Sequence, residues 1–271
     1  MLKINYFRSR FNISMVKLIL RNGGLFLGIW ILVMIIFTLS HAFSNGFPDV
    51  EYLWKFSLLP GLVLAGIAII STLLQKYIPV KKGINWIFLL VAIGIDQAIK
   101  IYLFSIDWEN LSKPIIEPVF YLEPTQNTLG SYLWVLLNFK NGSHLLNIIL
   151  FLSIGFLFVE VWRFYTRRKR NSFWINGFIH LFLAGLFANV IDNAYWGGSL
   201  DYITIRPFYT FDLKDMYITL CELFLITEFI DNKILLRLFR MPKDESQALN
   251  KEFISFVKND LRNIFRRRKQ Q

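Results

Sequence analysis

Four aspartates lie close together in the last third of the sequence, and their type and spacing could support acid–base chemistry. They are Asp192, Asp201, Asp212 and Asp215. Two carboxyl groups brought together cannot both ionise easily, so they share one proton. The charged member can act as a general base on water while the protonated member donates to a carbonyl oxygen. This is peptide hydrolysis without a metal ion or a serine or cysteine nucleophile.

A solvated acidic loop is the alternative interpretation of these aspartates. It suits Asp212 best, because Asp192 and Asp215 each border a long apolar run. Asn189 lies three residues before Asp192 at the end of such a run, so the two share a helix face.

A second polar group lies inside another apolar run, at residues 96–100, which read Asp-Gln-Ala-Ile-Lys. Asp96 and Lys100 are four residues apart, so on a helix they share a face and can pair. Charged groups inside a bilayer are costly, and they usually face the protein interior and mark function. A purely structural ion pair that orients helices is the alternative.

The composition indicates which elements must position these groups. Hydrophobic residues make up 55% of the sequence, charged residues 18%, and the mean hydropathy is +0.44. A soluble domain is usually less apolar and more charged. A helix needs roughly 20 mostly apolar residues to cross a bilayer, and the blocks that fit are 24–43, 56–75, 85–105, 144–162, 173–191 and 215–230. We therefore predict an all-α polytopic membrane protein with about six transmembrane helices.

The charges predict the orientation of these helices. The net charge is +11, and the basic residues concentrate in alternate connections, at 3–21, 76–82, 163–170 and 233–243. The other connections carry acidic residues instead. This alternation follows the positive-inside rule and predicts that both termini are cytoplasmic and that 106–143 and 192–214 lie on the outer face. It also argues against nucleic acid as the partner of the basic residues.

Several other chemistries are disfavoured by the residues present. The single cysteine, Cys221, excludes an internal disulfide framework and a multi-cysteine metal site. His41, His144 and His180 lie far apart and show no ligand spacing, so we expect no metal and no other cofactor. The basic and then apolar N-terminus is too long for a signal peptide and lacks a small-residue cleavage site, so we expect an uncleaved first span.

The polar residues, taken in order, resemble the motifs of the lipoprotein signal peptidases (signal peptidase II). This family consists of four-helix inner-membrane aspartyl proteases that remove signal peptides from prolipoproteins. Its Asp-Gln-x-x-Lys motif matches residues 96–100, and its Asn-x-Gly-Ala-Ala-Phe motif corresponds to 127–132. Its Gly-Asn-x-x-Asp-Arg motif corresponds to 188–193, its Asp-Phe to 201–202, and its Asn-x-Ala-Asp to 212–215.

The resemblance implies roles for individual residues. Asp201 and Asp215 would be the catalytic pair. A supporting polar shell or substrate-binding set would consist of Asp96, Lys100, Asn127, Asn189, Asp192 and Asp212. The substrate would be a membrane-inserted signal peptide followed by a lipid-modified cysteine, and the location would be the bacterial inner membrane.

The sequence departs from the family pattern at several positions. Asn193 replaces the arginine of the third motif, Asp212 replaces an asparagine and Lys214 an alanine in the last, and Leu129 and Tyr132 replace a glycine and a phenylalanine in the second. An extra aspartate would disturb the protonation of the pair, and lost polar partners would loosen substrate positioning. A non-catalytic membrane subunit of the same fold, which binds lipoproteins or partner helices, is therefore the alternative function. A small transporter is disfavoured because charged groups are few and no internal repeat is visible.

The chain extends beyond the region of resemblance on both sides. We predict an N-terminal extension with two transmembrane helices at 1–79, a signal-peptidase-II-like region at 80–232, and a basic amphipathic cytoplasmic tail at 233–271. The apolar face of the tail consists of Leu249, Phe253, Phe256, Val257, Ile264 and Phe265. Such a helix is expected to lie on the anionic inner leaflet, with an ordinary solvated helix as the alternative. Membrane lipids, and a membrane protein that contacts the N-terminal helices or the tail, are the expected partners.

Two further expectations concern local structure. Residues 106–143 contain aromatic and β-branched runs broken by prolines, which predicts a small extracytoplasmic β-rich platform beside Asp201. Glu222 lies seven residues after Asp215, so we expect both to point towards the interior of the bundle. Pairing of Glu222 with Lys100 and a protonated structural role both stay open.

Overall fold

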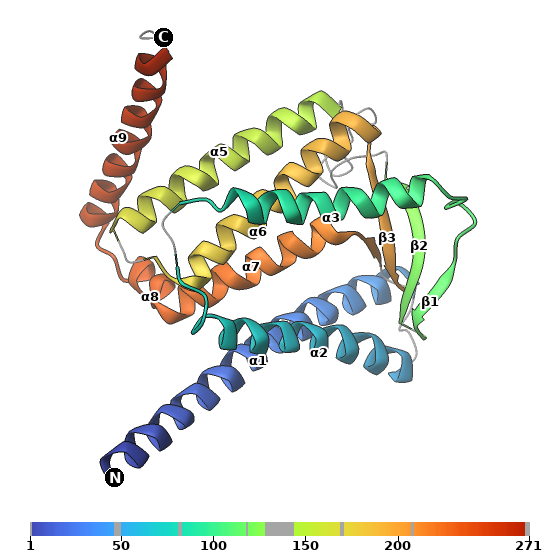
Figure 1. Ribbon diagram of the computed structural model, residues 1–271, viewed down its shortest axis with the longest axis horizontal. Coiled ribbons are helices and arrows are strands. Elements are labelled where there is room, and N and C mark those ends of the chain that lie inside the picture. The colour runs from blue at the N-terminus through green and yellow to red at the C-terminus, as the bar shows by residue number, and fades with distance from the viewer. Residues whose placement is uncertain are drawn as a thin grey trace. The chain divides into compact units, whose positions relative to one another are not determined.

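The computed structural model describes residues 2–45, 50–80, 83–117, 119–127, 144–168, 171–206 and 209–268, and these are mostly helical (Figure 1). The helices are α1 (Leu2–Asn45), α2 (Val50–Leu74), α3 (Trp86–Phe104), α5 (His144–Arg168), α6 (Phe173–Ile191), the π-helical turn η1 (Asp192–Trp196), α7 (Leu213–Asp231), α8 (Ile234–Phe239) and α9 (Lys243–Arg268). The strands are β1 (Lys113–Ile116), β2 (Phe120–Asn127), β3 (Ser199–Ile205) and β4 (Tyr209–Phe211).

Within the described residues, four helical segments are long and apolar enough to cross a membrane. They are Met15–Ile36, Trp86–Phe104, His144–Arg168 and Phe173–Trp196, and Leu58–Leu74 is a shorter apolar helix. These five segments correspond to the first five predicted blocks and confirm a mostly helical polytopic membrane protein. The sixth predicted block lies in α7, which is not among the four because acidic residues interrupt its apolar sequence.

The chain forms two compact units. Unit 1 comprises residues 1–79, 100–126 and 200–212, and unit 2 comprises 80–99, 127–199 and 213–271. The two N-terminal helices and almost all of the sheet belong to unit 1, whereas α5, α6, α7, α8 and α9 belong to unit 2.

The sheet of unit 1 has the strand order β1-β2-β3-β4, and the pairs β1–β2 and β3–β4 are antiparallel. β1 and β2 lie within the predicted β-rich platform, and β3, which carries Asp201, is the neighbour of β2. This part of the prediction is confirmed, while residues 128–143 lie outside the described part of the chain. The platform therefore contributes directly to the element that holds one of the predicted catalytic aspartates.

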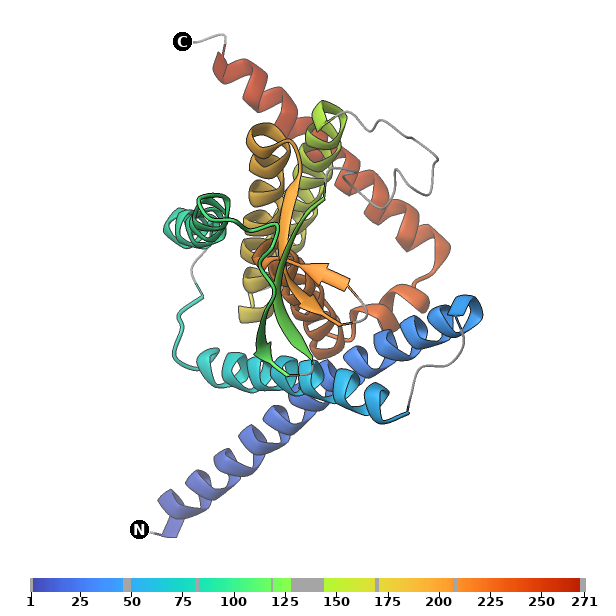
Figure 2. The same cartoon turned by 90° about the vertical axis from the view of Figure 1, so that its right-hand side faces the viewer.

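The N-terminal helices of unit 1 pack on the sheet. A buried hydrophobic cluster joins Trp30 and Met34 of α1 to Val119 and to Ile205 of β3. Figure 2 shows the ends of β1 and β2 reaching the crossing of α1 and α2. The helices that extend the chain before residue 80 thus support the platform through apolar contact.

Unit 2 is organised around α6, which lies between α5 and α7 (Figure 1). α6 starts at the N-cap Ser172, whose hydroxyl accepts a hydrogen bond of 3.1 Å from the backbone N–H of Ile175. Gly185 allows α7 to approach closely, because a Cβ there would lie 2.7 Å from Ile218 and 3.1 Å from the carbonyl oxygen of Lys214. Buried Ala184 and Ala188 line the same part of α6, as its small residues predict.

The buried face of α7, called the buried stripe below, is shifted by one residue from the predicted one. Lys214, Cys221 and Glu228, seven residues apart, are buried. Glu222 is exposed, so the expectation that it points inwards is wrong, and Asp215, seven residues before it, is also partly exposed. Residues seven apart share a helix face, and the face that carries Lys214 is the one that packs against α6.

The basic tail forms α9, which packs on α5. The ring centroid of Phe164 on α5 lies 5.3 Å from that of Phe253 and 5.5 Å from that of Phe256. Arg168 also pairs with Glu252 at 2.9 Å. Two residues of the predicted apolar face of the tail, Phe253 and Phe256, therefore contact another helix of the protein.

Candidate active site

Gln97 connects two of the predicted motifs within unit 2. Its amide nitrogen donates to Asp96 Oδ2 and to Asp192 Oδ1, both at 3.0 Å. Its amide oxygen accepts from the indole N–H of Trp196 at 3.0 Å. Because one amide nitrogen bonds to both carboxylates, Gln97 joins α3 to the turn that follows α6. Asp96 and Asp192 are both fully buried. Gln97 had no predicted role, although it lies between the two charged residues of its motif.

The placement of Asp192 follows from a change in helix type. α6 passes directly into the π-helical turn η1, and the backbone N–H of Asp192 bonds to the carbonyl oxygens of Ala188 and Asn189. Gly197, with φ 67°, ends the turn in the left-handed region. π-helical turns are rare and often occur at functional sites. Here the wider turn buries both Asp192 and Asn193 and leaves Tyr195 exposed.

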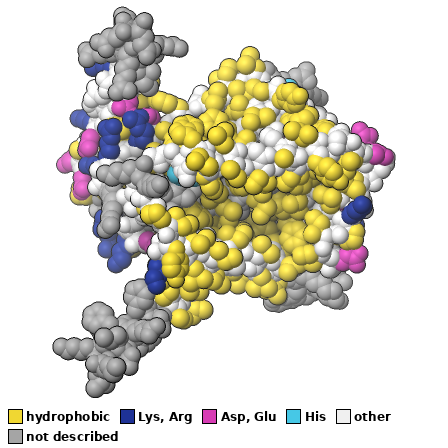
Figure 3. Space-filling view, in the orientation of Figure 1, with side chains coloured by type: hydrophobic (Ala, Val, Ile, Leu, Met, Phe, Trp, Pro, Cys, Tyr) yellow, Lys and Arg dark blue, Asp and Glu magenta, His cyan; other side chains and the backbone are white. Residues whose placement is uncertain are grey.

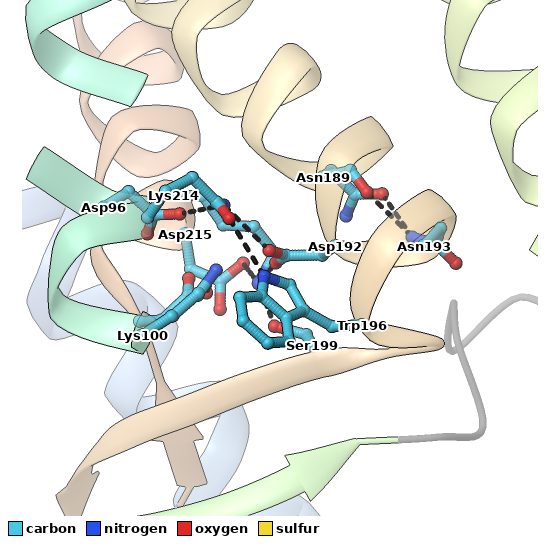
Figure 4. A network of polar contacts seen from close by, with 11 residues as sticks. Asp96, Lys100, Asn189, Asp192, Asn193, Trp196, Ser199, Lys214 and Asp215 are labelled. Atoms are coloured by element: carbon cyan, nitrogen blue, oxygen red, sulfur yellow. Dashed lines mark hydrogen bonds and ion pairs between the residues drawn. The ribbon is translucent and has the colours of Figure 1, made fainter. Parts of the chain in front are cut away.

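Lys214 occupies the centre of the polar network at the start of α7 (Figure 4). Its ammonium group donates to Ser199 Oγ at 2.6 Å and lies 3.7 Å from Asp192 Oδ2. It also lies 3.6 Å from Asp215 Oδ1. The Lys214 side chain is only 5% exposed, whereas that of Asp215 is 45% exposed. The cation balances a buried carboxylate, while Asp215 beside it stays partly exposed.

Asp215 gains additional support from its position in the first turn of α7. The N-terminal end of a helix carries partial positive charge and unpaired backbone N–H groups, which favour a carboxylate there. The helix thus provides an environment for a negatively charged side chain that water can reach.

Asn193 stands where the resemblance implies an arginine, and it is the centre of a chain of amides. Its Nδ2 donates to Asn189 Oδ1 at 2.9 Å, and its Oδ1 accepts from Asn147 Nδ2 at 3.2 Å. His144 Nδ1 lies 3.4 Å from the same Oδ1. Asn147 was not among the predicted site residues, although an asparagine within the apolar run 144–162 is an available signal. This chain of amides holds the end of α6 against α5 with neutral groups.

Unit 1 carries the other group of predicted site residues. Asp201 is buried on β3, and Asp212 follows β4. A carboxylate oxygen of Asp201 lies within 4.8 Å of one of Asp212. The β3–β4 register accounts for this proximity. It pairs Ile203 with Phe211, and the two aspartates lie directly beyond this pair at the same end of the hairpin.

Asp212 is fully buried, so the alternative interpretation, a solvated acidic loop, does not hold for this residue. Its Oδ2 lies 2.7 Å from Lys100 Nζ, and both side chains are fully buried. Unpaired buried charges are costly, and a close counter-ion offsets part of this cost. Lys100 is therefore an ion-pair partner, as expected for an intramembrane lysine, and the structure shows Asp212 in contact with it.

Asn127, the remaining predicted shell residue, ends β2 and is exposed. The rest of its motif, 128–132, lies outside the described residues. Its role in the shell stays a prediction.

Among the described residues of the predicted site, one pair of carboxylates in each unit is close enough to share a cation. The pairs are Asp96 with Asp192 in unit 2, and Asp201 with Asp212 in unit 1, with oxygens within 4.8 Å of each other in each pair. Oxygen ligands of this kind suit hard cations. In both units a lysine ammonium already lies beside one member, Lys214 at Asp192 and Lys100 at Asp212. The expectation that the protein uses no metal stays a prediction.

Apolar helices that carry buried carboxylates and lysines define the chain as an integral membrane protein with acid–base groups inside it. The family model of signal peptidase (SPase) II matches residues 87–231, more than half of the chain. The chain therefore belongs to the signal peptidase II family, which confirms the resemblance inferred from the motifs. The matched region runs from α3 to the end of α7 and includes all predicted site residues.

The chain is also similar to individual known proteins. The lipoprotein signal peptidase of Halothermothrix orenii (strain H 168 / OCM 544 / DSM 9562) is 28% identical over 141 residues, which cover 52% of this chain and 91% of that protein. Two solved structures, described as bacterial membrane enzyme structures by the in meso method at 2.3 Å and 1.9 Å resolution, are similar at 17% and 18% identity, with TM-scores of 0.42 and 0.43. The similarity covers 58% and 53% of this chain, respectively, and 90% of each of those chains.

Proposed function

We propose that this protein is a lipoprotein signal peptidase, a membrane aspartyl endopeptidase that cleaves a signal peptide before a lipid-modified cysteine. The observation that carries the proposal is the family match over 87–231, which contains the five motifs in order. Asp201 and Asp215 occupy the positions of the two catalytic aspartates of those motifs.

The proposed reaction uses these two carboxyl groups as one acid–base unit. The ionised group removes a proton from a water molecule, whose oxygen attacks the scissile carbonyl carbon, while the protonated group donates to the carbonyl oxygen. The tetrahedral gem-diol intermediate then collapses: one hydroxyl returns its proton to the second group as the carbonyl re-forms, the C–N bond breaks, and the departing amine takes a proton from the first group. One proton shared between two close carboxylates satisfies both roles. The products are a signal peptide with a free carboxylate and a lipid-modified cysteine with a free amine.

We propose that the supporting shell acts by positioning the two aspartates. In unit 2, the contacts of Lys214 with Ser199 and Asp192 restrain the first turn of α7, which carries Asp215. In unit 1, the Lys100–Asp212 pair restrains the end of the β3–β4 hairpin, whose first strand carries Asp201. Asp96, Asn189 and Asn127 complete the proposed shell.

The alternative is a non-catalytic membrane subunit that binds lipoproteins or partner helices. One observation favours it: Lys214 Nζ lies 3.6 Å from Asp215 Oδ1. A counter-ion stabilises the ionised form of a carboxylate and opposes its use as a proton donor. Under this alternative the protein would bind a lipid-modified precursor and leave it intact.

Cleavage of matched precursors by the purified full-length protein tests the proposal. One precursor carries the lipid on its cysteine, and the other has the same sequence without the lipid. We expect release of the signal peptide from the lipid-modified precursor alone. Binding of that precursor without cleavage would establish the non-catalytic alternative, and equal cleavage of both precursors would contradict the proposed substrate class.

We also propose that the protein lies in the bacterial inner membrane with both termini in the cytoplasm. Cysteines introduced at Ser112 and Thr166 test this topology, because Ser112 lies in an acidic connection and Thr166 in the basic last turn of α5. An impermeant thiol reagent outside intact cells should label Ser112→Cys and leave Thr166→Cys unlabelled. The reverse pattern would contradict the topology.

A further inference from the structure

A large cavity lies within unit 2 at the end of the bundle where α8 and α9 follow α7. Its volume is about 900 Å³, at the upper end of the range typical of small-molecule sites, roughly 300–1,000 Å³. Its walls come from α5, α6, α7, α8 and the first turns of α9. None of the proposed catalytic or shell residues lines it, so it is separate from the candidate active site.

The lining of this cavity has an apolar part. Side chains of the candidate membrane span α5, of α6 and of α7 form it, among them Phe158, Val161, Phe178, Leu225 and Phe229. Such a surface suits a hydrocarbon chain, because burial of apolar groups is favourable and needs no specific hydrogen bonds.

The lining also has a cationic part. Arg168, Lys233, Arg237 and Arg240 line the cavity, together with one acidic residue, Glu245. Arg168 pairs with Glu252 of α9, whereas Lys233, Arg237 and Arg240 are exposed. Figure 3 shows Lys and Arg side chains gathered at the α9 end of the molecule. The cavity therefore favours a ligand that combines an anionic group with an apolar chain.

The position of the cavity along α5 narrows the class of ligand. α5 is apolar enough to cross a membrane and ends at Arg168, and basic residues at a helix end typically mark the level of the lipid headgroups. Basic pockets between helices at this level bind anionic lipid headgroups. The apolar wall then faces the depth of the acyl chains and the basic rim faces the phosphates.

We propose that this cavity binds one anionic phospholipid of the adjoining leaflet. The phosphate lies against Lys233, Arg237 and Arg240, and an acyl chain lies against Phe158, Phe178 and Phe229. The bound lipid links α5 to α8 and α9, and it provides a specific anchor in addition to the charge of the tail. This binding site is independent of the proposed peptidase activity.

Lipid retention by the full-length protein tests the site. The protein is exchanged into detergent, mixed with phosphatidylglycerol or phosphatidylcholine of the same chain length, and examined by native mass spectrometry. We expect one tightly retained phosphatidylglycerol and at least about tenfold weaker retention of phosphatidylcholine, because anionic headgroups gain attraction from each nearby basic residue. Equal retention of both lipids would overturn the proposal.

Two variants separate the cavity from general surface charge. Lys233→Ala with Arg237→Ala should weaken phosphatidylglycerol retention roughly tenfold to thirtyfold. The matched control, Lys251→Ala with Lys258→Ala, removes the same charge from exposed positions of α9 that do not line the cavity, and should change retention little. An equal loss of phosphatidylglycerol retention in both double variants would show that the lipid is held by general surface charge, which would contradict the proposal.

A third variant tests the apolar part without a change in charge. Val161 lines the cavity and is 46% exposed, so Val161→Trp should fill part of the space and remain folded. Loss of phosphatidylglycerol retention is expected. Unchanged retention in Val161→Trp, or displacement of the lipid by millimolar inorganic phosphate alone, would show an anion site without an acyl-chain pocket.

Discussion

The two ends of the buried stripe on α7 hold their charged residues in different ways. At the start of the helix, Lys214 contacts Ser199 and lies within 4 Å of two carboxylates, those of Asp192 and Asp215. At the other end, Glu228 accepts hydrogen bonds only from uncharged groups among the contacts seen in the described residues: Tyr165 Oη at 2.6 Å, Asn232 Nδ2 at 2.8 Å and the hydroxyl of Ser172. At the start of α7 one ammonium group lies beside two carboxylates, whereas at the other end neutral donors surround a single carboxylate.

This difference distinguishes a structural group from a candidate reactive one. The donors around Glu228 come from α5, from the N-cap of α6 and from Asn232 directly after α7, so this carboxylate of α7 connects three helices. Glu228 is also 1% exposed and has no access to water. At the Lys214 end, one carboxylate is buried and another, Asp215, is half-exposed. Substitutions at this end should therefore affect cleavage, whereas those at the Glu228 end should affect stability alone.

The largest effect on folding is expected for Lys214→Met. Removing one partner of a buried ion pair leaves the other charge uncompensated, which costs about 3–5 kcal/mol. Asp192 and Ser199 both lose the ammonium group, so the start of α7 should shift and cleavage should fall as well. Thermal unfolding in detergent and precursor cleavage measure the two effects. The control is Lys251→Met, at an exposed position of α9. An equal loss of stability in this variant would show that the buried contacts of Lys214 are not the cause, and would contradict the comparison.

A smaller effect is expected for Glu228→Gln. The amide keeps the shape of the side chain but replaces charge-assisted hydrogen bonds with weaker neutral ones, at a cost of about 2 kcal/mol in unfolding free energy. Cleavage per folded molecule should equal that of the parent. A loss of cleavage with unchanged stability would assign a functional role to this end and would contradict the comparison.

The smallest effects are expected for a matched pair of glycine substitutions on α6. In Gly185→Ala the new Cβ would meet Ile218 at 2.7 Å and the carbonyl oxygen of Lys214 at 3.1 Å, whereas in Gly177→Ala it would meet the ring of Phe224. Overpacking of this kind typically costs about 1–3 kcal/mol. Both variants should lower the unfolding temperature, but only Gly185→Ala should also slow cleavage, since it displaces the turn that carries Lys214. Equal cleavage by the two variants would show that the helix contact at Gly185 does not position the site.

The sequence predicted those features that depend on local pattern. Apolar runs identified the helices, and aromatic and β-branched runs identified β1 and β2. The ordered motifs identified the family. Each run or motif is a short stretch of sequence. It can be recognised without knowing which stretches meet in the folded protein.

The sequence could not predict features that depend on helix rotation or distant pairing. The phase of α7 is fixed by its packing on α6, so the inward residues are Lys214 and Cys221, each one position before the expected Asp215 and Glu222. The burial of Asp212 depends on Lys100, which is more than a hundred residues away in sequence. The π-helical turn at Asp192 has no sequence signature that propensities would reveal.

The central claim is that Asp201 and Asp215 act as one catalytic unit, and the cleavage rate of a lipid-modified precursor tests it most directly. Asp201→Asn, Asp215→Asn and the double variant are compared with the parent and with Asp244→Asn, an exposed control on α9. Groups that act together in catalysis show strongly non-additive losses, so each single variant should lose on the order of a thousandfold and the double variant no more. Parent-like cleavage by either single variant, once its folding in the membrane is verified, would contradict the account.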